Sequence, residues 1–199
     1  MMTGYVLAGG RSSRMGCDKA LLAVGSRRLI ELVIEGLRPH VKPLVVIAHT
    51  RNRERLRDLQ VDGVLTDLMP DGGPLMGVYT GLMSSQTPLN LFVPCDMPWM
   101  DGRVIGPMVD AWREGIEMMA HRGPDGCLYP FPLLCHAKAL KAVGALLDRG
   151  MRSLHSLLEQ PQARLLTIDA PDALRYFTNV NTPEDYVQLS DEAVVAHRS

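Results

Sequence analysis

Short apolar runs alternate with longer amphipathic stretches along the 199-residue chain, and few folds accommodate such a pattern. Segment 44–48, Leu-Val-Val-Ile-Ala, is continuously apolar, as expected for a parallel strand covered on both faces. Segment 28–37 instead repeats its apolar residues at a helical period. This alternation predicts a doubly wound, mostly parallel α/β sheet. The predicted strands are 4–8, 44–48, 63–65, 89–93, 117–120, 127–135 and 164–168, and the predicted helices are 28–37, 54–59, 74–83, 104–113, 138–147, 153–159 and one opened by 182–185.

Length and composition narrow the class of protein. A chain of 199 residues with 46% hydrophobic and 22% charged residues suits one globular domain. A formal net charge of -1 carries no basic excess for nucleic acid. No apolar run has the roughly 18 residues of a membrane helix, and no leader pattern precedes the first strand. The four cysteines lack the spacing of a metal or redox motif, so we expect reduced thiols and a cytoplasmic protein.

Polar or glycine-rich residues follow the first four predicted strands. They are Gly9-Gly10, Thr50, Asp67 and Asp96. Ligands of doubly wound sheets bind beyond the carboxyl ends of the strands. The sequence therefore predicts a ligand site assembled from these four strand ends.

Segment 7–19, Leu-Ala-Gly-Gly-Arg-Ser-Ser-Arg-Met-Gly-Cys-Asp-Lys, indicates the chemistry of that ligand. Paired glycines let the backbone turn sharply and present N–H donors to phosphate oxygens. Arg14 can bind phosphate through two hydrogen bonds, and Lys19 supplies a point charge. The spacing matches neither the Walker loop nor the dinucleotide fingerprint. A surface turn with incidental basic residues is the alternative interpretation.

Asp96 is the candidate ligand for a metal ion. It lies between Pro94 and Pro98 at the end of a buried strand. A lone aspartate there is commonly a turn former or helix cap, but these prolines would aim it off the strand end. Mg²⁺ is usually held by one or two protein carboxylates, with phosphate oxygens and water.

The glycine-rich segment resembles the signature loop of the MobA family, the molybdenum cofactor guanylyltransferases. Pro-Cys-Asp-x-Pro at 94–98 is similar to the magnesium motif of that family, and Asn-x-Asn-Thr-Pro-Glu-Asp at 179–185 to its late signature. The resemblance runs in order from Tyr5 to about Leu189. Cytidylyltransferases of the same cofactor usually have Leu-Ala-Ala-Gly, so Gly9 favours guanine.

The resemblance implies a Rossmann-like, GT-A-like nucleotidyltransferase fold in one domain over 1–199, with NTP bound by about 1–100 and the acceptor by about 101–190. It implies Mg²⁺ as cofactor, with Asp96 as the metal ligand. The implied catalytic residues are Arg14, Lys19 and Asp96. The implied nucleotide-binding residues are Leu7, Ala8, Gly9, Gly10, Lys19, Thr50, Asp67, Gly73, Gly77 and Asp96. Thr50 departs from a base-contacting asparagine of the family, a role that Asn52 could take over, and Met76 replaces a small residue.

On the acceptor side, the resemblance implies binding by Asn179 and Asn181. Spaced by two on an extended segment, these side chains would point to one side; loop formation and helix capping are the alternative explanation. Segment 129–134, with Pro130 and Pro132, resembles the substrate-side strand of the family. It also fits an edge strand, because proline cannot donate to a sheet ladder. Arg152-Ser153-Leu154 resembles the start of a later family helix.

The expected reaction is transfer of GMP from GTP to the terminal phosphate of Mo-molybdopterin. Molybdenum cofactor delivery and insertion proteins are candidate partners, and a monomer is expected. A cytidylyl or sugar-phosphate nucleotidyltransferase is the second interpretation. A catalytically silent nucleotide-binding module is the third, and the joint presence of Arg14, Lys19 and Asp96 argues against it.

Overall fold

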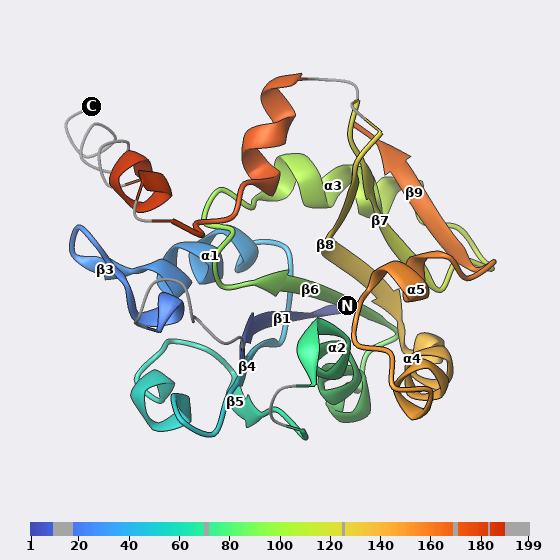
Figure 1. The fold of residues 1–199 in the computed structure, drawn as a ribbon, viewed down its shortest axis with the longest axis horizontal. Helices are drawn as coiled ribbons and strands as arrows, with labels where there is room; N and C mark the ends of the chain where they lie inside the picture. The colour runs from blue at the N-terminus through green and yellow to red at the C-terminus, as the bar shows by residue number, and fades with distance from the viewer. Residues whose placement is uncertain (10–17, 70–71, 125, 169–170, 183, 190–199) are drawn as a thin grey trace.

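The computed structural model describes residues 1–9, 18–69, 72–124, 126–168, 171–182 and 184–189. One twisted sheet of seven strands, ordered β5-β4-β1-β6-β8-β7-β9, runs through the molecule (Figure 1). Four neighbouring strands are mutually parallel: β5 (Gly63–Thr66), β4 (Leu44–Ala48), β1 (Met2–Ala8) and β6 (Leu89–Pro94). Strand β8 (Leu128–His136) is antiparallel to β6 and to β7 (Met118–Arg122), and β9 (Ala163–Thr167) is parallel to β7. The predicted mostly parallel α/β sheet is confirmed.

Helices cover both faces of this sheet (Figure 1). Helices α1 (Leu29–Leu37) and α3 (Gly102–Ala111) pack into one apolar core, which contains Val33 and Ile105. On the other face, α2 (Gly73–Ser84), α4 (Leu140–Asp148) and α5 (His155–Leu158) pack into a second core. The short helices are η1 (Lys19–Leu21), η2 (Arg53–Leu56), η3 (Ala137–Ala139) and η4 (Pro171–Phe177). Residues 184–189 are also helical. Apolar surface buried on both faces explains why the parallel strands are continuously hydrophobic.

The interpretation of segment 129–134 as an edge strand is wrong. Strand β8 lies inside the sheet, between β6 and β7. Its pairing with β7 is irregular between Met119 and His121. Met119 pairs with Leu134 of β8, but His121 pairs with Tyr129, so the β8 residues between them are skipped. Pro130 and Pro132 fall in that gap. An interruption of the ladder therefore accommodates the prolines, which have no N–H to donate.

Local structure differs from the prediction in three further places. The helix expected at 54–59 is the single 3₁₀ turn η2, and Ser153, expected to begin a helix, lies just before α5. Its hydroxyl still accepts a hydrogen bond from His155 N, at 3.2 Å. A two-stranded ribbon of β2 (Ala23–Val24) and β3 (Arg27–Arg28) was not expected. Gly25 has a φ of 60° there, which glycine adopts without strain.

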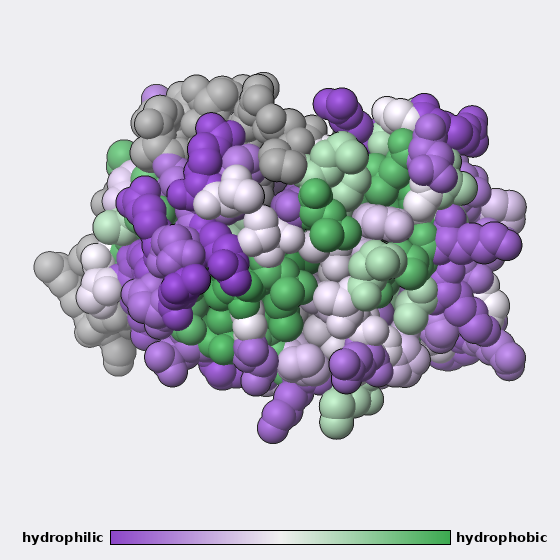
Figure 2. All heavy atoms as spheres, turned by 90° about the horizontal axis from the view of Figure 1, so that it is seen from below, coloured by the Kyte–Doolittle hydropathy of each residue, from purple (hydrophilic) through white to green (hydrophobic). Residues whose placement is uncertain are grey.

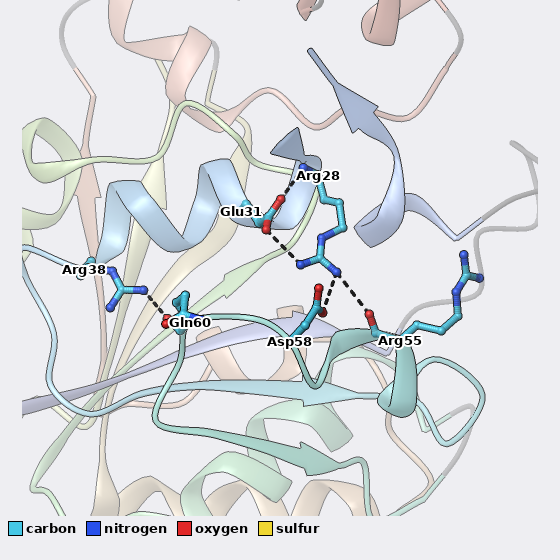
Figure 3. A network of polar contacts seen from close by, with 6 residues as sticks. All are labelled: Arg28, Glu31, Arg38, Arg55, Asp58 and Gln60. Atoms are coloured by element: carbon cyan, nitrogen blue, oxygen red, sulfur yellow. Dashed lines mark hydrogen bonds and ion pairs between the residues drawn. The ribbon is translucent and has the colours of Figure 1, made fainter. Parts of the chain in front are cut away.

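Arg28 joins helix α1 to the loop that follows η2 (Figure 3). Its guanidinium donates to Glu31 Oε1 and to Asp58 Oδ1, each at 2.9 Å, and to the carbonyl oxygen of Arg55 at 3.3 Å. Glu31 Oε2 in turn accepts from the backbone N–H of Arg28. The hydrogen bond to Arg28 lowers the pKa of Glu31. This network ties the start of α1 to η2 and to the residues that follow it.

Figure 2 shows the face below β5, α2 and α4, with hydrophilic residues toward both ends and apolar residues gathered between them. The exposed large apolar residues include Leu68, Met69 and Met83. Among the described residues, no helix is long and apolar enough to cross a membrane.

Candidate active site

A cavity of about 530 Å³ lies at the carboxyl ends of β1 and β6. Strand ends, the start of η1 and the start of α2 together form its wall. Its lining residues are Leu7, Ala8, Gly9, Asp18, Lys19, Ile47, Asp67, Gly72, Gly73, Pro74, Gly77, Pro94, Cys95, Asp96, Phe131 and Arg152. The volume is in the range of pockets for small ligands and cofactors. The cavity is thus where the sequence predicted a site.

Lys19 lies at the centre of the polar groups of this site. Its Nζ donates to Asp96 Oδ2 at 3.2 Å and to Asn181 Oδ1 at 2.5 Å. Asp96 is 77 residues and Asn181 is 162 residues from Lys19 along the chain. The fold therefore brings together one residue from each of three predicted motifs, at the boundary between the predicted NTP-binding and acceptor-binding parts.

Asp18, which directly precedes Lys19, is hydrogen-bonded to Asn52. Asp18 is the N-cap of η1, and its Oδ1 accepts from Ala20 N at 3.1 Å. Its Oδ2 accepts from Asn52 Nδ2 at 2.7 Å. The same Asn52 nitrogen donates to the carbonyl oxygen of Ala8 at 2.9 Å. Asn52 is 5% exposed and lies outside the cavity lining.

Asp96 ends the turn after β6 and is anchored through its backbone. The N–H of Cys95 donates to Leu7 O at 3.0 Å, and the N–H of Val180 donates to Asp96 O at 2.9 Å. Only Oδ2 of the side chain is paired, with Lys19; among the described residues Oδ1 is buried and has no partner. A buried carboxylate oxygen facing a cavity without a donor fits a hard cation. No group of three or more metal-binding side chains occurs in the described part of the chain, so ligand phosphates and water would complete the coordination.

Asp67 faces the cavity from the end of β5. Its Oδ1 accepts from Thr80 Oγ1 at 2.9 Å, and Thr80 Oγ1 accepts from the N–H of Leu68 at 3.2 Å. Burial raises the pKa of Asp67, and the Thr80 hydrogen bond opposes part of that shift. A Cβ at Gly9 would lie 3.4 Å from Asp67 Oδ2. Thr80 therefore holds one oxygen, while the other stays near the glycine-lined wall.

The first turn of α2 closes the opposite wall. Gly73 has a φ of +73°, and a Cβ there would lie 3.0 Å from the carbonyl oxygen of Arg152. A Cβ at Gly77 would lie 3.1 Å from Leu7 Cδ2. Both predicted nucleotide-site glycines are thus required for close approach, to the Arg152 segment and to β1. Met76, expected to reshape the pocket, is buried and is absent from its lining.

The other predicted site residues are distributed unevenly. Leu7, Ala8 and Gly9 line the cavity, whereas Thr50 is exposed and lies outside its lining. Asn179 is also exposed, so of the two asparagines only Asn181 reaches Lys19. Gly10 and Arg14 lie outside the described residues.

Phe131, Cys95 and Arg152 line the cavity without a role predicted for them. Burial raises the pKa of the Cys95 thiol well above its ordinary value, and Asp96 and Asp18 add to this. Such a thiol is a poor nucleophile. Arg152 could have been suspected from the Arg-Ser-Leu motif, but its closeness to Gly73 depends on the packing of distant segments.

Comparison with known proteins relates this geometry to a family. A family model described as the MobA-like NTP transferase domain matches residues 4–164. The chain belongs to the MobA-like NTP transferase family. Among relatives of this MobA-like chain is a molybdenum cofactor guanylyltransferase of Serratia proteamaculans, 33% identical over 96% of the chain and 95% of the relative. A probable molybdenum cofactor guanylyltransferase of Methanothermobacter thermautotrophicus is 35% identical over 90% of the chain and 94% of the relative.

Solved structures confirm the fold of this MobA-like protein. The molybdopterin-guanine dinucleotide biosynthesis protein A of Archaeoglobus fulgidus superposes with a TM-score of 0.81 at 19% identity, covering 99% of this chain and all (100%) of that one. A nucleotidyl transferase of Methanothermobacter gives a TM-score of 0.76 at 21% identity, covering 98% and 99%. The predicted family and single-domain nucleotidyltransferase fold are confirmed.

Proposed function

We propose that this protein transfers GMP from GTP to the terminal phosphate of Mo-molybdopterin, forming molybdopterin guanine dinucleotide and pyrophosphate. Relatives at 33% and 35% identity over most of the chain carry the name of this activity. The observation that supports it best is the placement of Lys19. Its Nζ lies between Asp96 and Asn181, where the predicted nucleotide and acceptor parts meet.

The reaction needs charge neutralisation and alignment more than proton transfer. A phosphate monoester is already ionised near pH 7, so its oxygen can attack the α-phosphorus of GTP without a general base. A new P–O bond forms as the bond from the α-phosphorus to the bridging oxygen breaks, and pyrophosphate carries away the electron pair. Catalysis then depends on holding the two phosphates in line and on stabilising the developing charge.

The chain's own residues divide this work. Lys19 neutralises the α- and β-phosphates, and we assign Arg14 and the N–H groups of the glycine-rich segment to the rest of the triphosphate. Asp67 accepts hydrogen bonds from the guanine, since its Oδ2 faces the cavity while Thr80 occupies Oδ1. Asn181 and Asn179 are assigned to the acceptor. Mg²⁺, held by Asp96, would supply positive charge to the phosphates.

Cellular context forms part of the proposal. Neither Cys95 nor Cys135 takes part in a disulfide, which supports the cytoplasm as the location. Proteins that deliver and insert the molybdenum cofactor are the partners that this chemistry would need, because the acceptor arrives already carrying its metal.

Pyrophosphate release tests the proposal. Purified protein with Mg²⁺ and molybdenum-loaded molybdopterin would be compared with GTP, CTP, ATP and UTP as donors. Release with GTP well above the other three is the expected result. A preference for CTP would retain the mechanism and overturn the base assignment. Tight GTP binding with no release would contradict the transferase and favour a silent nucleotide-binding module.

A further inference from the structure

Asn52 occupies an unusual position for an asparagine at a helix start. It is the N-cap of η2, a position where asparagine side chains normally accept a hydrogen bond from the helix. No such bond forms here. The side chain instead turns inward, where it is 5% exposed, and its Oδ1 is buried without a partner among the described residues. An unpaired buried oxygen costs stability, so the inward orientation needs a compensating contact.

That contact is made by the amide nitrogen alone. Asn52 Nδ2 donates to Ala8 O at 2.9 Å and to Asp18 Oδ2 at 2.7 Å. Both partners are acceptors, so only the nitrogen, with its two hydrogens, can face them. Ala8 is the last residue of β1, and Asp18 directly precedes Lys19. One neutral side chain thus joins the end of β1 to the N-cap of η1.

We propose that Asn52 is a positioning residue, which ties the start of η1 to the end of β1 and so sets Lys19 for the phosphates of the nucleotide. This inference rests on the proposed function. Asp18 transmits the effect, because its other oxygen caps η1 at Ala20 N and η1 begins with Lys19. Fixing the backbone at Lys19 before the ligand arrives lowers the ordering cost of binding.

The bridge also controls a negative charge. Asp18 and Lys19 both line the cavity. With Asn52 in place, both oxygens of Asp18 have donors, Ala20 N and Asn52 Nδ2. Without the amide, Oδ2 loses its partner and Asp18 can turn toward Lys19, where it would compete with phosphate for the ammonium group. Asn52 therefore keeps the Asp18 carboxylate away from the lysine and from the anionic ligand.

Asn52→Ala tests this role, and Asn90→Ala is the matched control. Asn90 is also buried, at 0% exposed, and also bonds a loop: its Oδ1 accepts from Ser85 Oγ, and its Nδ2 donates to Thr87 O at 3.3 Å. It lies near the amino end of β6, where it pairs with Thr3 of β1. The cavity lies at the opposite, carboxyl ends of these strands. Both variants lose buried hydrogen bonds, so both are expected to lower the unfolding temperature.

Of these two variants, only Asn52→Ala should weaken the binding of GTP. We expect its Kd and KM for GTP to rise about tenfold, the scale of a lost hydrogen bond to a charged group, with the KM for the acceptor within about twofold of the unsubstituted value. Asn90→Ala should leave both values unchanged. Asn52→Asp, which faces Asp18 with a second carboxylate, should be worse than alanine. Adding Asp18→Asn should recover part of that loss, because it restores a donor between the two positions.

Hydrogen exchange of the ligand-free protein gives a readout that needs no nucleotide. The backbone amides of 20–22 bond to Asp18 and Lys19, and they should exchange faster in Asn52→Ala than in Asn90→Ala. Equal exchange in the two variants, or unchanged GTP affinity in Asn52→Ala, would overturn the inference. If the unsubstituted protein binds none of the four nucleotides, the proposed function fails, and exchange alone decides whether Asn52 holds the start of η1.

Discussion

At the scale of single residues, Asp96 carries the clearest unmet requirement of the site. Its Oδ1 is buried with no partner in the described part of the chain, while Oδ2 bonds Lys19. The turn that carries it is held by backbone hydrogen bonds of Cys95 and Val180, which do not involve the carboxylate. The side chain can therefore be changed without dismantling the turn.

Asp96→Ala should abolish pyrophosphate release, by about 10³-fold or more, because charge stabilisation at a phosphoryl group is lost. The unfolding temperature should change by only a few degrees. Asp96→Asn is the matched control: it retains the shape and should lose activity nearly as completely. Near-normal turnover by either variant at saturating Mg²⁺ would show that Asp96 does not hold the metal.

Thr80 is expected to control how Asp67 responds to pH. Burial raises the pKa of Asp67, and the hydrogen bond from Thr80 counteracts it. Thr80→Val keeps the shape and removes the hydroxyl, so the pKa of Asp67 should rise further. A protonated carboxyl has a donor where guanine needs an acceptor; GTP affinity therefore falls as pH drops through this pKa.

The measurement is the Kd for GTP as a function of pH in both proteins. In Thr80→Val, the loss of affinity should begin at a higher pH than in the unsubstituted protein, and the two curves should converge at high pH. Thr80→Ser, which retains the hydroxyl, should follow the unsubstituted curve. Superimposed curves for all three proteins would remove Asp67 from guanine recognition.

At the scale of elements, local patterns predicted the strands and helices that pack into the two cores. The continuous apolar run of β4 was predicted with its observed bounds, because burial on both faces leaves no polar position. Strand β8 was predicted as a strand, but its place at the edge of the sheet was wrong. Its prolines suggest an edge strand, and the sequence does not reveal that the hydrogen-bond ladder to β7 is interrupted there. The β2–β3 ribbon was missed because each strand has only two residues.

Among the residues at the site, those that belong to a local sequence motif could be predicted, and those placed by long-range contacts could not. Lys19, Asp67 and Asp96 could be predicted, because each directly follows a strand or lies in a dense motif. Asn52 could not be assigned its bridge, because its partners Ala8 and Asp18 are 44 and 34 residues away. Those contacts depend on how η2 packs, which no local pattern encodes.

Helix 184–189 and the segment before it are held by Asp185. Its Oδ2 accepts from the N–H groups of Asn181 and Thr182, each at 2.8 Å, and Asp185 N donates to Thr182 Oγ1. These backbone hydrogen bonds lower the pKa of Asp185. The carboxylate thereby fixes the residue whose side chain contacts Lys19.

Asp185→Ala should cost about 1 kcal/mol of unfolding free energy at pH 7, as for other lost caps, and should raise the KM for the acceptor. The pKa of Asp185 is lower in the folded protein than in the unfolded chain, where it is about 4. The carboxylate therefore stabilises the fold at pH values above about 4, and this stabilisation is lost as the pH falls through the pKa of the folded protein. The difference between variant and parent should therefore shrink in acid. Urea unfolding at pH 7 and pH 3 measures this difference in unfolding free energy. The control is Glu184→Ala, a change of the neighbouring carboxylate on the same exposed turn. A difference that persists at pH 3 would rule out the carboxylate as its source.

At the scale of the whole molecule, the predicted nucleotide and acceptor parts are not independent bodies. Residues 89–92 of β6 pair with residues 133–136 of β8, so one sheet crosses the boundary near residue 100. Two contacts at the site cross it again: Val180 N with Asp96 O, and Lys19 with Asn181. Separating the parts would expose strand edges and both cores.

One cooperative thermal transition should therefore describe the protein, and calorimetry tests this. GTP with Mg²⁺ at about 100 times its Kd should add about 2.7 kcal/mol of stability and raise the transition by roughly 5–10 °C. CTP at the same concentration should shift it less, if Asp67 recognises guanine. Because the sheet is continuous, the acceptor part must be stabilised together with the nucleotide part, although the residues proposed to bind GTP all lie in the latter. Two resolved transitions, with GTP moving just one of them, would mean that the β6–β8 ladder does not couple the two parts.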